Sequence, residues 1–508
     1  MKHWALIIFA MFFSMNCWSS EIEPGEALPN VTAPIGTALD KAARNQTTVI
    51  QVGAEQIQAY LPLLKGKRVG LVANQTSVAF RVDDFLIIDV DVDVDVDVDV
   101  DVDVDVDVDV DVDVDVDVDV DVDVDVDVDV DQAEATQYEK SNQVTNIHLL
   151  DLLLAHKVNV THVFAPEHGV RGDHSDGEIV KSSVDAKTGI PLVSIYGKNK
   201  RPPAKIVEQL DVIVYDIQDV GARFYTYINS MFYMMQAAQE QGIPFIVLDR
   251  PNPHLQKVDG PMLDPEFRSF VGLLPVPMVY GLTVGELAKM IVGENWLNTI
   301  QPLTKNTMPK PLALTVVPVN HYQRTSSYNL PIPPSPNLPN AKAVELYPSL
   351  VLFEATTVSI GRGTSLPFQV IGHPKVFTGE FTFTPRSIAG VSKYPKWENT
   401  QLTGTNLSII SDTKTDPTSS KAGSTSSKLN FSGLHQWNLL FKLKADKNKG
   451  LIHPHTFIDR PAFFDKLAGT SSFRKALLDG ESIEAIRKDW APGLNQFLID
   501  RQPYLIYR

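Results

Sequence analysis

The sequence predicts an α/β protein: a Rossmann-like parallel-sheet domain over about residues 45–300, followed by a smaller α+β domain over residues 301–508. Three observations predict this fold class. Short, continuous apolar runs alternate with helical stretches in the first part of the chain, which is typical of a parallel sheet covered on both faces. Polar residues follow these runs directly, and the second part lacks the same alternation. An apolar content of 44% in 508 residues is enough for sizeable cores, so the chain is globular.

The elements of the first domain are predicted from local patterns in chain order. The first strand is Val69–Ala73, and the stretch NIHLLDLLLAHK predicts a helix that Asn146 caps. A second strand, Val158–Phe164, is stopped by Pro166. The runs PLVSIYG, DVIVYDIQDVG and PFIVLDRPNP predict three more strands, and TYINSMFYMMQAAQEQG predicts the helix between the last two. No GxGxxG or Walker motif opens these helices, so no nucleotide is expected as a partner.

The second domain is predicted from weaker signals. PIPPSPNLP, residues 331–339, indicates a rigid extended linker or wall. We expect β-like runs around Glu354, Arg362 and Gly363, and a helix over Ser482–Asp500. These elements indicate a small α+β domain packed against the first.

The N-terminal residues 1–20 have the layout of a signal peptide. One positive charge precedes an apolar run from Trp4 to Phe13, and small residues precede a cleavage point after Ser19. The run is too short to span a membrane as a mature helix, so we expect an exported protein, in the periplasm. A lipid anchor on Cys17 is the alternative. Cys17 is the only cysteine, so no disulfide is expected in the mature protein.

A repeat of Asp and Val fills residues 89–131 and dominates the net charge of -17. Removing its 22 Asp from that charge leaves +5, with no Lys/Arg-rich block, so nucleic acid is not an expected partner. As one strand the repeat would reach roughly 140 Å, far beyond any globular strand. A hairpin would set Asp beside Asp and has no turn residue. We expect a solvated, mostly disordered insert; a weak Ca²⁺-binding or adhesive element is the alternative.

Polar side chains collect at the carboxyl ends of four predicted strands, where ligands bind in open α/β sheets. They are, strand by strand, Asn74 and Gln75; Glu167 and His168; Asp216, Gln218 and Asp219; and Arg250 and Asn252. Loops are polar in most proteins, so any one of these residues carries little weight. Their repetition at successive strand ends predicts a binding or catalytic rim.

The densest polar stretch is PEHGVRGDHSDGE, residues 166–178. Its spacing matches no established metal site, so acid–base chemistry by Glu167 is the favoured interpretation. A carboxyl group partly buried at a strand end can have its pKa raised enough to protonate a leaving group. An ion pair between Glu167 and Arg171 is the structural alternative.

The stretch DIQDVGARFYTY, residues 216–227, combines two carboxylates, an amide, Arg223 and aromatic rings such as Tyr225. Such a set suits a sugar, whose faces stack on rings and whose hydroxyl groups need bidentate acceptors. The alternative is that Phe224 and Tyr227 pack under the following helix. The short motif GRGT places Arg362 between two glycines, with clearance for an anionic ligand; a generic turn is its alternative.

Several longer motifs occur together in one order. GLVANQTSV, FAPEHGVRG, YDIQDVGARFYTY, LDRPNP, VYGLTVGELA, PPSPNLP and EATTVSIGRGT with PFQVIGHP resemble the exo-β-N-acetylmuramidase (NamZ-type) family of glycoside hydrolases. The resemblance covers about residues 65–508, apart from the repeat. It implies a Rossmann-like domain, a smaller C-terminal domain and an active-site cleft between them. It also implies release of N-acetylmuramic acid (MurNAc) from the non-reducing end of peptidoglycan fragments such as MurNAc-GlcNAc, in cell-wall recycling. The sequence itself has no cofactor signature and no established metal-site spacing, so no cofactor and no metal are expected.

The resemblance also implies roles for the polar residues. We expect Glu167 to act as general acid with His168 orienting it, and Asp216 or Asp219 to serve as base or stabiliser. Substrate contacts are expected from Asn74, Gln75, Arg171, Glu178, Gln218, Arg223, Tyr225, Arg250, Asn252, Glu354 and Arg362. Glu178 is also a less favoured second carboxylate.

MurNAc carries a lactyl carboxylate, so a cation is expected in its pocket, and Arg171, Arg250 and Arg362 are the candidates. Two other functions remain open. A catalytically inactive protein would bind muramyl sugars and release nothing. A metal-dependent hydrolase or esterase would use His168 and His174.

Overall fold

The computed structural model describes residues 49–81, 94–108, 114–128, 145–167, 169–172, 183–197, 199–301, 310–376, 379–409, 428–447 and 457–508. The chain divides into two compact units, Met1–Val49 and Ile50–Arg508, and the helices and strands given below all lie in the second. The predicted signal peptide and Cys17 lie outside the described residues. Within the described ranges, no helix has both the length and the apolar character that crossing a membrane requires.

A seven-stranded sheet forms the centre of the second unit, with the strand order β11-β10-β9-β1-β6-β8-β7. Six strands run parallel: β1 (Val69–Ala73), β6 (Val160–Ala165), β8 (Pro191–Ser194), β9 (Val212–Asp216), β10 (Phe245–Leu248) and β11 (Leu314–Val317). At one edge β7 (Ser183–Val184) pairs antiparallel with β8. The predicted α/β class is confirmed, and the sheet takes its last parallel strand from beyond residue 300.

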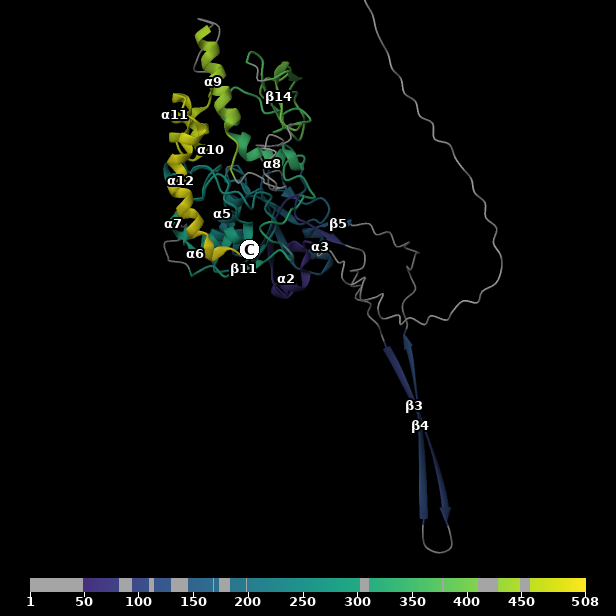
Figure 1. Cartoon of the computed structure of the whole chain (residues 1–508). Coiled ribbons are helices and arrows are strands. Elements are labelled where there is room, and N and C mark those ends of the chain that lie inside the picture. The colour runs from purple at the N-terminus through teal and green to yellow at the C-terminus, as the bar shows by residue number, and fades with distance from the viewer. Residues whose placement is uncertain are drawn as a thin grey trace, which may run out of the picture. The chain divides into compact units, whose positions relative to one another are not determined.

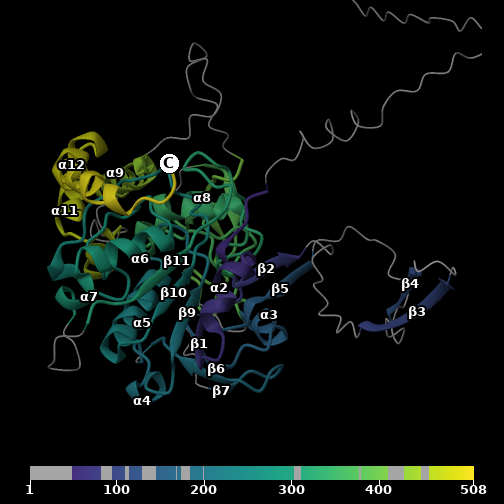
Figure 2. The ribbon, with the colours of Figure 1, turned by 90° about the horizontal axis from the view of Figure 1, so that it is seen from below.

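Helices cover both faces of this sheet, because successive side chains of a strand point to opposite faces. On one face, α5 (Tyr227–Gln241) and α6 (Val284–Gly293) share a core with the strands. On the other face, α2 (Ile57–Leu64) and α3 (Leu149–Ala155) do so, and Figure 2 shows the two layers. The short helices α4 (Ala204–Val207) and α7 (Trp296–Thr299) contact α5.

The helix predicted from NIHLLDLLLAHK begins later than expected. Thr145–His148 forms β5, which pairs antiparallel with β2 (Val78–Arg81), and α3 follows it directly. The cap is therefore His148, whose Nδ1 accepts a hydrogen bond from the Leu150 N–H at 3.2 Å, and the prediction of Asn146 is wrong. Asn146 belongs to a ladder with a strand more than sixty residues away in sequence, which no local pattern indicates.

The Asp-Val repeat is inserted between β2 and β5, which pair with each other. Within it, β3 (Val94–Val108) and β4 (Val114–Val128) pair antiparallel, with Val opposite Val and Asp opposite Asp. These two ranges differ from the expected, mostly disordered insert. The two strands can pair without a specific turn sequence because the repeat has a period of two residues. Shifting one strand by two residues restores the same Val–Val and Asp–Asp pairs, so many turn positions are equivalent. The Asp–Asp pairs remain unfavourable for such a hairpin.

The C-terminal part combines a small antiparallel sheet with helices, as the predicted α+β character requires. Its strand order is β12-β14-β13, from Val370–His373, Leu402–Asn406 and Phe381–Phe383. The helices are α8 (Ala341–Leu350), α9 (Ser432–Lys447), α10 (Pro461–Ala468), α11 (Ser472–Asp479) and α12 (Ile483–Asp500). In Figure 1, α10, α11 and α12 lie side by side, and their contacts agree. The prediction of a helix that starts after Ser482 is confirmed.

Short 3₁₀ turns complete the second unit. They are η2 (Gly53–Glu55), η4 (Pro265–Phe267), η5 (Val351–Ala355) and η7 (Gln502–Tyr504). Glu354 lies in η5, so the β-like run expected there is wrong; the helical backbone of α8 continues into η5 instead. Arg362 lies in a turn between Gly361 and Gly363, whose φ angles of 82° and 78° favour glycine. The backbone of GRGT therefore agrees with the alternative interpretation of this motif, a generic turn.

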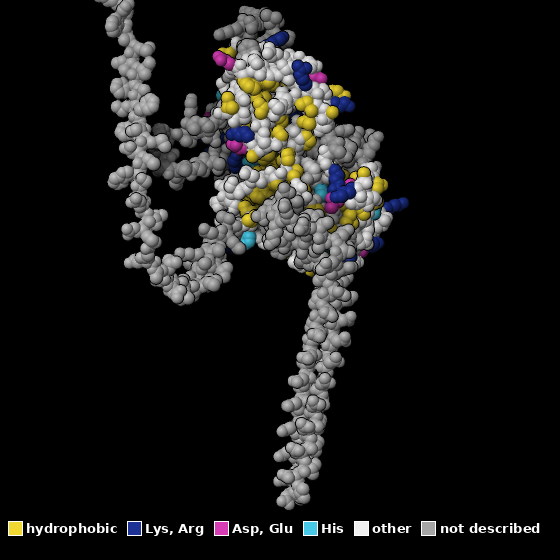
Figure 3. All heavy atoms as spheres, turned by 90° about the vertical axis from the view of Figure 1, so that its right-hand side faces the viewer, with side chains coloured by type: hydrophobic (Ala, Val, Ile, Leu, Met, Phe, Trp, Pro, Cys, Tyr) yellow, Lys and Arg dark blue, Asp and Glu magenta, His cyan; other side chains and the backbone are white. Residues whose placement is uncertain are grey.

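Charged side chains are dispersed on one face of the molecule (Figure 3). On the face shown in Figure 3, Lys and Arg side chains lie singly or in small groups between hydrophobic and neutral side chains. This pattern agrees with the small net charge that the chain has apart from the Asp-Val repeat.

Candidate active site

Glu167 lies two residues after β6, at the carboxyl end of the sheet. The Tyr196 hydroxyl donates a hydrogen bond to its Oε1 at 2.6 Å, and the Thr226 hydroxyl donates to its Oε2 at 3.0 Å. Tyr196 follows β8, the neighbouring strand, and Thr226 immediately precedes α5. The carboxyl group is half-buried and held at both oxygens. It is therefore fixed in one orientation, as an acid–base group must be.

Neither Tyr196 nor Thr226 is predicted from the sequence as a site residue. Both had a usable signal, because Tyr196 is the last residue but one of the run PLVSIYG and Thr226 stands at the start of a helix. Polar residues at those two positions reach the same rim as Glu167.

Asp216 and Arg250 form a buried ion pair. Arg250 Nε lies 2.5 Å from Asp216 Oδ1, and Arg250 Nη2 lies 2.8 Å from Asp216 Oδ2. The two side chains are 0% and 2% exposed, and Nη2 also donates to the Val78 carbonyl at 2.8 Å. Because both charges are already matched, this pair links β9 to β10 and β2 and offers little to a ligand.

Asp219 has a different environment on the loop after β9. Its Oδ2 accepts hydrogen bonds from the Gly221 N–H at 2.6 Å and from the Tyr280 hydroxyl. Its Oδ1 is buried and has no hydrogen-bond partner among the described residues. Burial raises the pKa of Asp219 to about 6, and the hydrogen bonds from Tyr280 and the backbone oppose that rise. A carboxyl group with this pKa exchanges protons in the range where acid–base catalysis operates.

The loop after β1 presents two amides to the same edge. Asn74 Oδ1 accepts from the Thr76 N–H at 2.9 Å, whereas Asn74 Nδ2 is buried with no partner in the described part of the chain. Gln75 Nε2 donates to the Pro334 carbonyl at 3.2 Å, and its Oε1 is likewise unpartnered within the described residues. Tyr225 donates to the same Pro334 carbonyl at 2.6 Å. The predicted proline wall therefore closes over the strand ends.

Two further predicted substrate arginines, like Arg250, bind the protein itself. Arg171 lies between Asp151 and Asp185, with contacts of 3.0–3.1 Å to both carboxylates. Among the described residues these two acids form its ion pairs, so the alternative of an ion pair with Glu167 is not what the structure shows. Arg223 is 0% exposed, and burial lowers its pKa to about 9. It donates to four backbone carbonyls, those of Pro261, Val276, Leu467 and Ala468.

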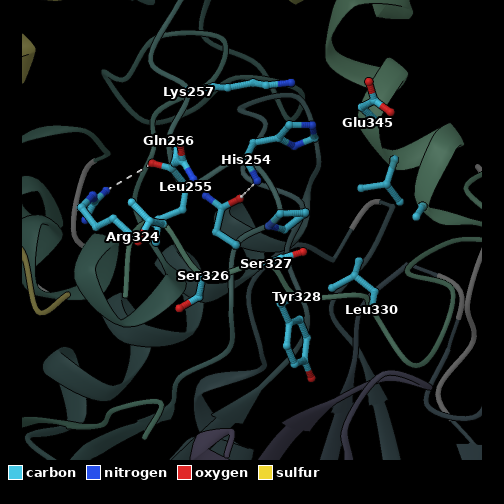
Figure 4. A pocket seen from close by; sticks show the side chains of 15 residues that line it. His254, Leu255, Gln256, Lys257, Arg324, Ser326, Ser327, Tyr328, Leu330 and Glu345 are labelled. Carbon is cyan, nitrogen blue, oxygen red and sulfur yellow. Dashed lines mark hydrogen bonds between the residues drawn. The ribbon is translucent and has the colours of Figure 1, made fainter. Parts of the chain in front are cut away.

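Two further predicted residues, Gln218 and Asn252, lie in loops that follow β9 and β10. Gln218 Nε2 donates to the Asp219 and Pro251 carbonyls, both at 2.7 Å. Asn252 Nδ2 donates to the Leu282 carbonyl at 2.8 Å. Asn252 also lines a cavity of about 460 Å³ beyond β10. Figure 4 shows this cavity between His254 and Lys257 on one side and Tyr328 and Leu330 on the other.

A second cavity, of about 450 Å³, lies in the C-terminal part and contains the last predicted pair. Arg362 Nε lies 2.6 Å from Glu354 Oε1, and the two side chains are 23% and 20% exposed. Both residues line this cavity together with three further cationic side chains, those of Lys393, Lys396 and Arg460.

Three predicted residues cannot be placed. His168, His174 and Glu178 lie outside the described residues. Within the described ranges, no group of three or more His, Cys, Asp or Glu side chains is arranged to hold a metal ion.

Models of one protein family match most of the chain after the repeat. The N-terminal domain of the exo-β-N-acetylmuramidase NamZ matches residues 136–342, and its C-terminal domain matches residues 345–507. The peptidoglycan β-N-acetylmuramidase NamZ of Bacillus subtilis (strain 168) is 38% identical over 366 residues, which are 69% of this chain and 80% of that protein. The chain belongs to the NamZ family. The resemblance seen in the motifs is thus confirmed, and Glu167 falls within the N-terminal NamZ match.

Two solved structures share the fold of this NamZ-family chain. Both are DUF1343 family proteins of Bacteroides fragilis NCTC 9343. One is 35% identical with a TM-score of 0.65, and the alignment covers 91% of this chain and 99% of that one. The other is 26% identical with a TM-score of 0.62, covering 90% and 99%. The α/β sheet and the smaller C-terminal part are therefore features of this fold.

Proposed function

We propose that this NamZ-family chain is an exo-acting glycoside hydrolase that releases MurNAc from the non-reducing end of peptidoglycan fragments such as MurNAc-GlcNAc. The observation that carries the proposal is the placement of Glu167 at the end of β6, with both carboxyl oxygens held by hydroxyl groups. The related Bacillus subtilis protein is named a peptidoglycan β-N-acetylmuramidase, which supports the substrate class. Cell-wall recycling is the process that such a reaction serves.

In the proposed reaction, Glu167 protonates the glycosidic oxygen as the bond to the leaving sugar breaks. Tyr196 and Thr226 hold its carboxyl group toward the substrate. A glycosidase of this kind uses a second carboxyl group, and Asp219 suits that role better than Asp216. Asp216 is neutralised by Arg250, whereas Asp219 has an oxygen with no hydrogen-bond partner in the described ranges and a pKa raised by burial.

Hydrolysis of defined substrates tests the proposal. The purified chain is expected to release MurNAc from MurNAc-GlcNAc and from para-nitrophenyl-β-MurNAc, with and without EDTA, and to leave GlcNAc-MurNAc intact. Mass spectrometry of the products identifies the sugar released. Loss of turnover in EDTA that added metal restores would support a metal-dependent hydrolase. Binding of MurNAc-GlcNAc without any turnover would support an inactive binding protein.

The pH dependence of the reaction tests the role of Asp219. Because burial raises its pKa to about 6, kcat/KM is expected to rise with pH through about 6 as the carboxylate base forms. Asp219→Asn is expected to lower kcat about 100-fold and to remove this rising limb. Rate measurements from pH 4 to 9 check both effects, and a variant that keeps the limb contradicts the role.

The same carboxyl group links stability to pH. Its pKa is higher in the folded chain than the unfolded value of about 4, so the folded state binds the proton more tightly. Its contribution to the free energy of unfolding is therefore present below pH 4 and is lost as the pH rises through about 6. The Asn side chain does not titrate, so the stability of Asp219→Asn does not fall for this reason as the pH rises. The melting temperature of the variant minus that of the parent chain is therefore expected to increase between pH 4.5 and pH 7.

We also propose export, with the periplasm as the place of action, on the basis of the leader-like residues 1–20. The mass of the mature chain tests this, because cleavage after Ser19 leaves a chain that begins at Ser20, whereas a lipid on Cys17 adds acyl mass. Weak Ca²⁺ binding by the Asp-Val repeat stays an alternative to be tested. Calcium titration of the full chain against a chain that lacks residues 91–130 decides it.

A further inference from the structure

The cavity of about 450 Å³ in the C-terminal part is rich in cationic groups. Its lining includes four cationic side chains, those of Arg362, Lys393, Lys396 and Arg460, and one carboxylate, that of Glu354. Asp459 is the other acid that acts on Lys396. Positive charge therefore exceeds negative charge around the cavity, and its size is in the range of about 300–1,000 Å³ that takes small molecules.

Two of these cationic side chains, Lys396 and Arg362, already bind other groups of the protein. Lys396 is mostly buried and donates to the carbonyls of Phe353, Thr356 and Val358, and burial lowers its pKa. Arg362 is paired with Glu354 at 2.6 Å. These contacts fix the shape of the cavity more than they attract a ligand.

The other two cations are exposed and oriented by weaker contacts. Arg460 donates from Nη2 to the Glu354 carbonyl, and its guanidinium lies 4.8 Å from the Phe463 ring centre. The amine of Lys393 lies 5.5 Å from the ring centre of Tyr394. No carboxylate is within ion-pair distance of either group in the described part of the chain. Arg460 and Lys393 are therefore the groups from which an anion would gain most.

The cavity also has aromatic and apolar surface beside the charges. Tyr394 is 81% exposed, which is unusual for a large aromatic ring, and Val358, Ile360 and Pro395 line the same space. A sugar stacks its ring face on such a side chain. The combination of an exposed ring with two available cations fits a pyranose that bears a carboxylate better than it fits a bare inorganic anion.

Aromatic rings connect the cavity to the candidate active site. The Arg362 guanidinium lies 5.1 Å from the Phe368 ring centre, and Phe368 packs edge-on against Tyr347 at 4.9 Å. Tyr347 contacts Tyr225 at 6.1 Å, and the Tyr225 hydroxyl binds the proline wall above the strand ends. A row of packed rings thus leads from Arg362, on the cavity wall, to Tyr225 at the proposed hydrolytic site.

We propose that this cavity binds the lactyl carboxylate of a muramic-type sugar acid, with Arg460 and Lys393 as the anion-binding groups and Tyr394 under the sugar ring. The proposal rests on the proposed function for its choice of sugar. The sugar acid has two sources, the terminal MurNAc of the substrate and the MurNAc released by hydrolysis. In both cases the carboxylate is what separates MurNAc from GlcNAc, which lacks it.

Isothermal titration with the free monosaccharides tests the site directly. MurNAc is expected to bind the full chain at least tenfold more tightly than GlcNAc, and the difference is expected to shrink at high salt. Arg460→Gln and Lys393→Gln are each expected to weaken MurNAc binding about fivefold to tenfold and to leave GlcNAc binding unchanged. Lys475→Gln, an exposed charge change on α11, is the matched control and is expected to have no effect. Equal affinities for the two sugars, or unchanged MurNAc binding in both variants, overturn the proposal.

Kinetics of the same variants separate the two sources and the two proposals. A higher KM for MurNAc-GlcNAc in Arg460→Gln assigns the cavity to the substrate, whereas a change only in inhibition by MurNAc assigns it to the product. If MurNAc binding depends on Arg460 but the chain shows no turnover, the proposed sugar-acid site is supported and the proposed hydrolase activity is contradicted. If turnover is normal and Arg460→Gln binds MurNAc as tightly as the parent chain, the proposed hydrolase activity is supported and the proposed sugar-acid site is contradicted.

Discussion

Glu167→Gln is expected to lower kcat for MurNAc-GlcNAc about 10³-fold, because the amide cannot donate the proton that the leaving sugar needs. The amide oxygen still accepts one of the two hydroxyl hydrogen bonds, and the amide nitrogen donates to the oxygen of the other hydroxyl, so the fold around it should persist. Hydrolysis rates and thermal melting of the parent and the variant measure both effects. Retained activity would remove Glu167 from the acid role.

The choice of leaving group distinguishes loss of an acid from general damage. An aryl leaving group of low pKa needs little protonation, so the Glu167→Gln variant should lose much less activity on 2,4-dinitrophenyl-β-MurNAc than on the disaccharide. Glu208→Gln, at an exposed position after α4, is the matched control and is expected to keep full activity. Equal losses on both substrates would indicate a positioning role for Glu167.

Arg223→Met is expected to lower the free energy of unfolding by about 3 kcal/mol, because it leaves four buried backbone carbonyls without their donor. Two of these carbonyls, those of Leu467 and Ala468, belong to the end of α10, and the other two belong to Pro261 and Val276. Removing the buried charge offsets part of the loss, since burial already lowers the pKa of Arg223 to about 9. Urea unfolding measures the change.

Limited proteolysis adds a local readout for the same variant. Cleavage in the region of α10 and α11 is expected to accelerate, because the contact that Arg223 makes with the end of α10 is lost. Arg386→Met removes an exposed arginine with one long hydrogen bond of 3.5 Å to Asn399 and should change neither stability nor cleavage. An Arg223→Met chain as stable as this control would contradict the role of Arg223 as a clamp.

Local patterns predicted the regular elements well. Strand β1 spans the predicted Val69–Ala73, and α12 starts after Ser482 as expected, since each depends on apolar periodicity and a cap within a few residues. The start of α3 was missed because β5 is held by its partner β2, across the whole Asp-Val insert. The β-like run expected at Glu354 is wrong because helical backbone continues past α8 into η5, although the residues around it are apolar or β-branched.

The chemistry of individual charges was harder to predict. Arg223 and Arg250 stand in polar motifs that suit a sugar, yet both are buried and bound to the protein. Arg171 stands four residues after Glu167, a spacing that allows an ion pair between them, yet it pairs with Asp151 and Asp185. A motif shows which groups are present near a strand end, but it does not show which neighbouring segment supplies their partners.

The sequence by itself determined the α/β class, the polar strand ends and the prominence of Glu167, because these depend on residue order within short windows. Only the tertiary structure decided which charged groups are available for chemistry. Adjacent strands β9 and β10 bring Asp216 against Arg250 and neutralise both, whereas β6, β8 and the start of α5 bring the hydroxyl groups of Tyr196 and Thr226 to Glu167. The physical reason is that a charged side chain can act on a ligand only if no neighbouring side chain neutralises it. Its neighbours depend on the strand order, and packing of the whole sheet sets that order.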